Sequence, residues 1–244
     1  MKLLIDAGNT RIKWALVKGK KWLRTGALPI GEAGGLSELF SGSEEIRQIW
    51  VSNVSGEKVA QHIRDIGRDK ARETHFVVAQ DIQCGVRNGY SKPAQLGSDR
   101  WAALIAARHL MQGKCLVVNS GTATTIDTLT KQGKFLGGLI VPGVELMQHS
   151  LIAATEHLRS GRGKFVRFPL NSADAMHSGA IQASCGAIER QYTLLNDSSA
   201  VVVLSGGAAR LLLPYLQQGL FGLPPRVVDN LVLHGLLLIA QESG

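Results

Sequence analysis

The chain has 244 residues, of which 45% are hydrophobic and 19% charged, and its formal net charge is +8. This balance predicts a globular protein with one large or two small domains, and it excludes a disordered chain. The Lys and Arg residues are scattered, so the positive charge favours small anionic ligands over a nucleic-acid partner.

The first apolar run is too short for a signal peptide, and no stretch reaches the roughly 18 apolar residues that a membrane helix needs. The three cysteines, Cys84, Cys115 and Cys185, lie far apart and follow neither a disulfide framework nor a metal-ligand spacing. The seven histidines form no HxxxH or HExxH pair. We therefore expect a cytoplasmic protein with reduced cysteines and no membrane contact.

Two segments of the chain share one pattern. Residues 2–17 (KLLIDAGNTRIKWALV) and 115–130 (CLVVNSGTATTIDTLT) each contain an apolar strand, a small polar turn with glycine, and a second strand. Each continues through a lysine-containing turn into a third short run. The repeat predicts two similar domains, 1–113 and 114–244, each opening with a β-meander. A chance similarity within one α/β protein is the alternative.

The remaining segments alternate between strands and helices. Strands are predicted at residues 48–53, 75–79 and 201–207, and helices at 55–67, 99–112, 172–195 and 229–241. The strand that begins at residue 201 runs into a glycine turn. This alternation indicates an α/β architecture.

The first glycine turn, DAGNT at residues 6–10, has the composition of a phosphate site. Successive backbone N–H groups bind an anion in such a turn, and Gly8 allows the backbone to come close to it. Asp6, at the end of the strand, suits a hydrated Mg²⁺, and Lys13 on the second strand is within reach of the same anion. An ordinary hairpin with a polar turn is the alternative.

A second turn, at Gly121-Thr122, repeats this arrangement in the other half of the chain. Two such hairpins facing each other clamp a nucleotide between domains. A third glycine turn at residues 205–207 follows a strand and is a candidate position for the adenosine.

The sequence resembles type III pantothenate kinases over nearly its full length. DAGNTRIK at 6–13 matches the first phosphate motif of that family, GSDR at 97–100 matches its GxDR motif, and GTA at 121–123 matches its second phosphate motif. GVRNGY at 85–90 matches the segment on the substrate side, and GGLIVPG at 137–143 matches a further family segment.

The resemblance implies two RNase H-like, actin-type domains with the nucleotide in the cleft between them, and a homodimer. It implies that Mg-ATP phosphorylates pantothenate, the first step of coenzyme A synthesis. The ATP contacts that it implies are Asp6, Ala7, Gly8, Asn9, Thr10, Arg11, Ile12, Lys13, Gly121 and Thr122. The implied pantothenate contacts are Tyr90, Gly97, Ser98, Asp99, Arg100 and Ser172.

Asp99 is the predicted general base, because phosphoryl transfer needs a carboxylate that orients the accepting hydroxyl and takes its proton. A helix N-cap is the alternative role for Asp99. Arg100 is expected to neutralise the substrate carboxylate or the moving phosphoryl group, with a surface salt bridge as the alternative. Tyr90 is expected to close the substrate pocket, with plain packing as the alternative.

Two positions depart from the family pattern. Asn119 stands where the family has an Asp associated with K⁺ or NH₄⁺, and an Asn offers a carbonyl oxygen but no charge. We therefore expect the protein to work without a filled monovalent-cation site. Ser172 stands where the family commonly has a Thr that contacts the substrate, and the hydroxyl is kept.

Two other functions compete with this one. Another kinase or phosphatase of the same superfamily would act on a sugar or a polyphosphate, but the segments around Tyr90 and Asp99 match the pantothenate enzymes. A non-catalytic regulatory protein on the same scaffold would have no need for Asp99.

Overall fold

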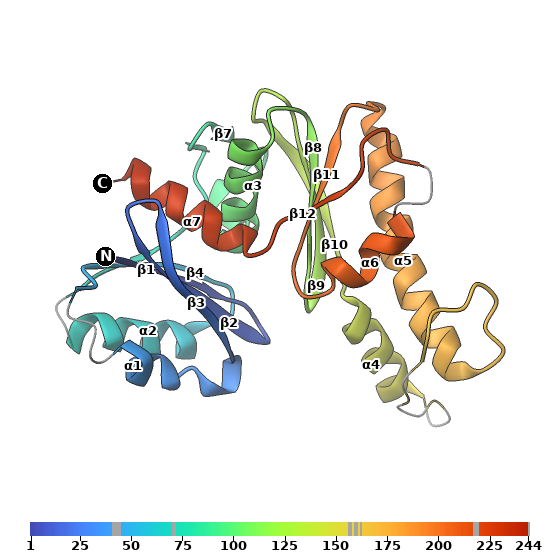
Figure 1. Cartoon of the computed structure of the whole chain (residues 1–244), viewed down its shortest axis with the longest axis horizontal. Coiled ribbons are helices and arrows are strands. Elements are labelled where there is room, and N and C mark those ends of the chain that lie inside the picture. Colours follow the sequence, from blue (N-terminus) through green and yellow to red (C-terminus); the bar gives the residue numbers. More distant parts are fainter. Residues whose placement is uncertain are drawn as a thin grey trace. The chain divides into compact units, whose positions relative to one another are not determined.

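The computed structural model describes residues 1–40, 45–69, 72–155, 158, 161, 163–216 and 220–243 (Figure 1). Its strands are β1 (Lys2–Ala7), β2 (Arg11–Lys18), β3 (Lys21–Pro29), β4 (Gln48–Asn53), β5 (Glu73–Phe76), β6 (Ile82–Gln83), β7 (Val86–Arg87), β8 (Cys115–Ser120), β9 (Ala123–Leu129), β10 (Phe135–Pro142), β11 (Val201–Ser205) and β12 (Arg226–Val227). Its α-helices are α1 (Gly35–Phe40), α2 (Glu57–Asp69), α3 (Ser98–Leu110), α4 (Val144–Ala154), α5 (Ser172–Leu195), α6 (Ala209–Leu216) and α7 (Leu231–Glu242).

The chain forms two compact units. The first comprises Met1–Leu110, Gly133–Phe135 and Asn230–Gly244, and the second comprises Met111–Gln132 and Leu136–Asp229. These units differ from the continuous halves 1–113 and 114–244 expected from the sequence. The difference arises because the tip of the β9–β10 hairpin and the last helix pack in the first unit.

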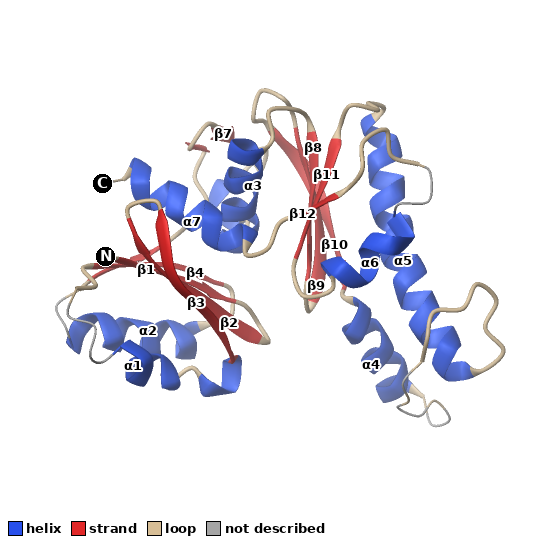
Figure 2. Cartoon of the chain, in the orientation of Figure 1, coloured by secondary structure: helices blue, strands red, loops and turns tan. Residues whose placement is uncertain are grey.

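Each unit contains one five-stranded sheet (Figure 2), and the strands follow one another in the same order in both sheets. The first has the order β3-β2-β1-β4-β5, with β2 antiparallel to its two neighbours and β1, β4 and β5 parallel. The second has the order β10-β9-β8-β11-β12, with β9 antiparallel to β8 and with β8, β11 and β12 parallel. The predicted α/β class and the repeated meander are confirmed.

Strand β5 begins two residues before the strand predicted at 75–79 and ends at Phe76. Its four residues pair in parallel with Gln48–Val51 of β4. Only one further backbone bond follows, from the Val77 N–H to the Val51 carbonyl at 2.8 Å. The apolar residues at 77–79, on which the prediction relied, therefore lie beyond the end of the β4–β5 pairing.

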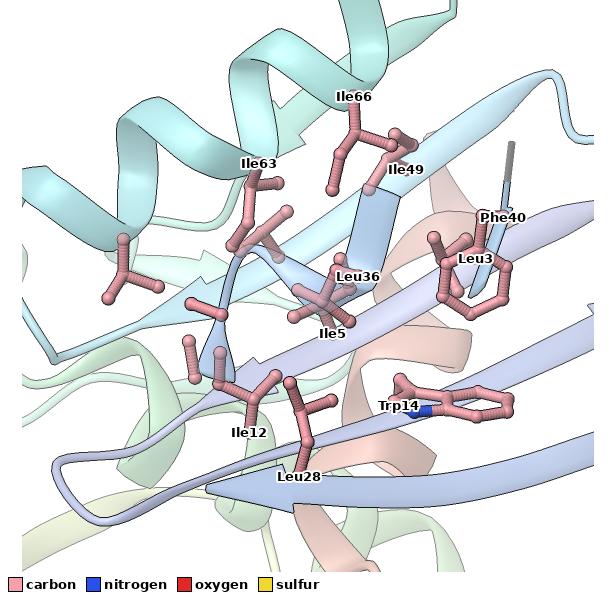
Figure 3. Packing of buried hydrophobic residues seen from close by; sticks show 14 of the residues in the cluster. Leu3, Ile5, Ile12, Trp14, Leu28, Leu36, Phe40, Ile49, Ile63 and Ile66 are labelled. Atoms are coloured by element: carbon pink, nitrogen blue, oxygen red, sulfur yellow. The ribbon is translucent and has the colours of Figure 1, made fainter. Parts of the chain in front are cut away.

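One face of the first sheet packs against α1 and α2. Leu3 and Ile5 of β1 point into this layer, where the rings of Trp14 and Phe40 meet edge to face with centroids 5.0 Å apart (Figure 3). Because side chains alternate along a strand, Leu4 and Asp6 lie on the opposite face. Asp6 therefore does not belong to the layer under α1 and α2.

That opposite face is covered by α3 and α7 (Figure 1). A Cβ at Gly235 of α7 would collide with the Ala102 carbonyl of α3, so glycine allows the two helices to pack at close range. At its end, α7 contacts the β6–β7 hairpin: the Cys84 N–H donates to Glu242 at 2.9 Å. Helix α7, although last in the chain, completes the first unit.

In the second unit, α4, α5 and α6 contribute side chains to one apolar cluster with β8 and β11. Helix α5 is capped at its start by Asn171, whose side chain accepts the Asp174 N–H at 2.9 Å. It ends at Asn196, which has a left-handed φ of 48°. None of the described helices is both long enough and apolar enough to span a membrane.

Candidate active site

The turn between β1 and β2 presents its backbone at the surface of the first unit. The Gly8 N–H donates to the Arg11 carbonyl at 3.1 Å, and a Cβ on Gly8 would lie 3.3 Å from that carbonyl. Asn9, Thr10 and Arg11 are exposed. The turn is therefore closed by its own hydrogen bond and exposes the residues that follow Gly8.

Two residues of the predicted phosphate segment are core residues. Ala7 and Ile12 are fully buried and belong to the layer under α1 and α2, so only their backbone is available to a ligand. The Ser55 hydroxyl supports the turn from behind and donates to the carbonyls of Ala7 at 2.8 Å and Gly8 at 2.9 Å. The sequence analysis missed Ser55, which only the fold brings to this turn.

Asp6 lies at the end of β1, in register with Lys13 on β2 and with Ser52 on β4. Burial raises the pKa of the Asp6 carboxyl to about 7; the negative charge of Asp99 adds to the rise, and Lys13 opposes it. The two carboxyl groups therefore lie close enough to interact. The structure brings together the two acidic residues that the sequence analysis singled out.

Helix α3 places Asp99 in its first turn. The Gly97 carbonyl accepts the first helical hydrogen bond, from the Trp101 N–H at 2.9 Å, so Gly97 occupies the capping position. Asp99 is therefore not the N-cap. Its Oδ1 accepts the Arg100 N–H at 2.8 Å and would lie 2.6 Å from a Cβ at position 97. Glycine at position 97 makes room for the carboxylate to fold back over the helix start.

The start of α3 is fixed to the first sheet by two serines. The hydroxyl oxygens of Ser98 and Ser52 are 2.9 Å apart and buried, and Ser52 lies beside Asp6 in the parallel register of β4 and β1. Burial raises the pKa of Asp99, while the N–H and the charge of Arg100 oppose the rise. Ser98 thus supports the position of Asp99.

Arg100 and Tyr90 form a buried cluster with Phe135. Arg100 is only 5% exposed, and its Nη1 donates to the Tyr90 hydroxyl at 3.0 Å. Its Cζ lies 5.9 Å from the ring centroids of both Tyr90 and Phe135, which are themselves 5.7 Å apart and stacked. Arg100 is therefore a buried residue rather than a surface residue. Phe135 was not predicted, because it is far from the other two residues in the sequence.

The second turn, in the second unit, joins β8 to β9. The Gly121 N–H donates to the Ala123 carbonyl at 2.9 Å, and Gly121 and Thr122 are exposed. A Cβ at Gly143 would collide with the Gly121 carbonyl, and the Gly143 N–H donates to Thr122 at 2.8 Å. Gly206, with a φ of 94°, packs in the same way on the Ser120 backbone. Three glycine segments therefore meet at this turn.

The two residues that depart from the family pattern also lie in the second unit. Asn119 is the penultimate residue of β8, half-buried and in register with Thr125 of β9. Ser172 is the first residue of α5, exposed and next to the cap residue Asn171. Tyr90 and Asp99 therefore lie in the first unit, whereas Ser172 lies in the second.

Few side chains are available in the described residues to hold a metal ion. No three or more His, Cys, Asp or Glu side chains gather there. Asp6 and Asp99 form a pair of carboxylates beside a turn of backbone N–H groups. Mg²⁺ is commonly bound by one or two carboxylates together with water and substrate phosphates, so this pair fits Mg²⁺.

A family model for type III pantothenate kinases matches residues 2–194. The chain belongs to the type III pantothenate kinase family. A type III pantothenate kinase of Aromatoleum aromaticum is 45% identical to it over 244 residues, which cover 100% of this chain and 99% of the relative.

Solved structures agree on the fold. A protein of Sinorhizobium meliloti described as a 2-dehydro-3-deoxygalactonokinase matches 99% of this chain and 96% of its own, with a TM-score of 0.62 and 15% identity. A Campylobacter jejuni protein described as a Baf family transcriptional activator matches 99% and 98%, with a TM-score of 0.60 and 21% identity. At such identities the likeness concerns the two-domain, actin-like kinase fold alone.

Proposed function

We propose that this chain transfers the γ-phosphoryl group of ATP to the primary hydroxyl of pantothenate, which yields 4′-phosphopantothenate for coenzyme A synthesis. The observation that carries the proposal is the Asp99 carboxylate at the start of α3. The preceding residue, Ser98, contacts Ser52, the register neighbour of Asp6, and Asp99 lies within the unit that carries the first phosphate turn. A kinase needs a base and a phosphate site in this kind of proximity.

The phosphates of ATP are bound by the backbone of the segment Asp6–Lys13. The turn of Gly121 and Thr122, exposed in its own unit, is a second backbone site for a phosphate. The exposed side chains of Asn9, Thr10 and Arg11 and the half-buried Lys13 amine add donors, whereas Ala7 and Ile12 contribute only backbone. Asp6 holds Mg²⁺, through water. When bound, the ion neutralises charge on the phosphates.

Asp99 orients the primary hydroxyl of pantothenate and accepts its proton. As the new oxygen–phosphorus bond forms, the bond between the γ-phosphorus and the bridging oxygen breaks, and ADP leaves. The raised pKa of Asp99 suits a base, because proton transfer is most effective when the pKa of the base is closer to neutral pH.

Pantothenate is an anion, and Arg100 supplies the positive charge on its side of the site. Tyr90, Gly97 and Ser98 contribute further contacts in the first unit, and the exposed hydroxyl of Ser172 is a separate candidate contact. The side chain of Arg100 is held by Tyr90, so the guanidinium is already oriented before substrate arrives.

We propose that a monovalent cation is dispensable in this chain. The residue before the second turn is the neutral Asn119, and a full charge there is what would hold K⁺ or NH₄⁺ against the cost of removing its water. The backbone of Gly121 and Thr122 has its own support from Gly143.

We further propose that the chain is a cytoplasmic homodimer. Strand β10 lies at the edge of the second sheet and α4 follows it directly. Their exposed apolar side chains are Leu136, Leu139, Ile140, Leu146 and Leu151. An exposed apolar strand edge followed by an apolar helix suits a second copy of the chain. Light scattering of the wild type and of Ile140→Glu tests this, because the variant should shift toward monomer.

The proposed reaction is tested by incubating the purified protein with Mg-ATP and pantothenate. Mass spectrometry should detect 4′-phosphopantothenate and ADP in equal amounts, and Asp99→Asn should give neither. Parallel incubations with sugars test the nearest competing kinases. Turnover of a sugar without turnover of pantothenate would overturn the substrate assignment, and no turnover of any acceptor would overturn the assignment as a kinase.

A further inference from the structure

The β9–β10 hairpin belongs to two units at once. Its strands form the edge of the second sheet, but its tip, Gly133–Phe135, packs in the first unit. There the Gly133 carbonyl accepts the Arg87 N–H at 2.9 Å, and Lys134 forms a parallel bridge with Arg87. The tip is therefore attached by its backbone to the segment 85–90, which the proposed function places beside the substrate.

The fit at this tip is close. Gly133 has a left-handed φ of 82°, and a Cβ there would collide with the Gly85 carbonyl and lie 3.0 Å from the Arg108 Nε. Phe135, two residues further on, is fully buried, as is Val86 in the segment that the tip contacts. A left-handed glycine and a buried ring in one tight turn fix the direction in which the Phe135 ring points.

The Phe135 ring points at the two proposed substrate residues. Tyr90 stacks on it at 5.7 Å between centroids, and the Arg100 guanidinium lies 5.9 Å from the centroids of both rings. A guanidinium beside aromatic faces is attracted by their electron density, and the Tyr90 hydroxyl accepts one of its N–H groups at 3.0 Å. The two rings and the Tyr90 hydroxyl therefore all contact the guanidinium and contribute to its orientation.

We propose that Phe135 is a positioning residue for the anionic substrate. It orients Arg100 and Tyr90 and so sets the affinity for the pantothenate carboxylate without touching the reacting atoms. This inference rests on the proposed function, since it assumes that Arg100 faces pantothenate. It adds Phe135, the first residue of β10, to the residues proposed to bind or orient pantothenate.

Phe135→Leu and Phe135→Met remove the aromatic face but keep an apolar side chain. In both variants the KM for pantothenate should rise about 10-fold, as the loss of a ring pair and a cation–π contact predicts, while kcat and the KM for ATP change little. Phe135→Tyr keeps the ring and should retain a KM close to that of the wild type.

Phe40→Leu is the matched control. It removes a buried ring from a comparable aromatic contact, with Trp14, in the layer on the other face of the first sheet. It should lower the Tm and leave the KM for pantothenate unchanged. An equal rise of KM in Phe40→Leu, or an unchanged KM in folded Phe135→Leu, would overturn the positioning role.

The same experiment separates this inference from the proposed function. A wild type that does not phosphorylate pantothenate contradicts the function, whereas an active wild type with an unaffected Phe135→Leu contradicts only the role of Phe135. A crystal structure of Phe135→Leu gives a readout besides activity. If Arg100 stayed hydrogen-bonded to Tyr90 in its present orientation, the inference would be overturned even for an inactive wild type.

Discussion

The two glycine turns have the same strand frame but different chemistry. Both follow the central strand of a five-stranded sheet, and in both a glycine N–H donates to a carbonyl on the far side of the turn, from Gly8 and from Gly121. The first turn is preceded by Asp6 and lies near Asp99, whereas the second is preceded by Asn119 and Ser120. The same backbone frame is therefore repeated, and the acidic residues that we propose for proton transfer and Mg²⁺ lie at the first turn.

The largest effect on activity is expected from Asp99, near the first turn. Asp99→Asn should reduce kcat by about 100-fold or more, because an amide cannot accept the proton of the attacking hydroxyl. ATP binding should stay close to the wild-type value, and the Tm should not fall, because burial disfavours the charged form of Asp99. Steady-state kinetics and calorimetric titration with a nonhydrolysable ATP analogue measure both. A kcat near that of the wild type would remove Asp99 from the mechanism.

The common feature of the two turns is tested by Gly8→Val and Gly121→Val. A branched side chain at either position occupies the space of an approaching phosphate, so each variant should weaken nucleotide binding by about 10-fold or more. Gly34→Val is the control, because Gly34 is exposed and a Cβ there meets no atom within 4 Å. Normal ATP binding by Gly121→Val would show that the second turn is only a hairpin.

The carboxyl pair should reduce the stability of the protein at neutral pH. The folded-state pKa of Asp6 is raised to about 7, so the folded state holds a proton that the unfolded state has already released above pH ~4. Stability should therefore fall as the pH rises from about 4 to 7. In metal-free buffer, Asp6→Asn should gain roughly 1–4 kcal/mol at pH 8 and little at pH 4.

Urea unfolding at the two pH values measures this difference. Asp65→Asn is a control, because Asp65 lies on α2, outside the carboxyl pair. An Asp6→Asn variant that is no more stable than the wild type at pH 8 would contradict the burial and repulsion inferred for this pair.

The smallest effect on activity is expected at the second turn, which the neutral Asn119 precedes. Replacing NaCl with KCl at constant ionic strength should change the activity of the wild type by less than about twofold, because Asn119 provides no charge to hold K⁺. Asn119→Asp should become responsive to K⁺ in the same assay. Strong activation of the wild type at low millimolar K⁺ would mean that other oxygens form a cation site.

Local features of the fold were predictable from the sequence, but contacts between distant segments were not. The strand–turn–strand pattern around Gly8 and Gly121 depends on short-range hydrogen bonds, and the apolar spacing of α3 and α5 depends on the helical repeat. These elements were predicted to within a few residues. The apolar pattern of α7 predicted a buried helix, but it holds no information on which sheet the helix covers.

The same limit applies to the candidate site. Asp6, Gly97 and Asp99 were proposed from short motifs, in which the candidate residues are neighbours in the sequence. Ser52 and Phe135 were missed, because each contacts a candidate site residue that is distant in the sequence: Ser52 contacts Ser98, and Phe135 contacts Tyr90. A buried serine or phenylalanine looks like an ordinary core residue until its partner is known.

Helix α7 also makes the first unit discontinuous in sequence. It contacts β1, β2 and β4, and with α3 it covers the face of the first sheet that carries Leu4. A fragment 1–113 lacks this helix and would leave part of that apolar face open to water and to other chains. We therefore expect such a fragment to aggregate, although it contains every strand of the first sheet.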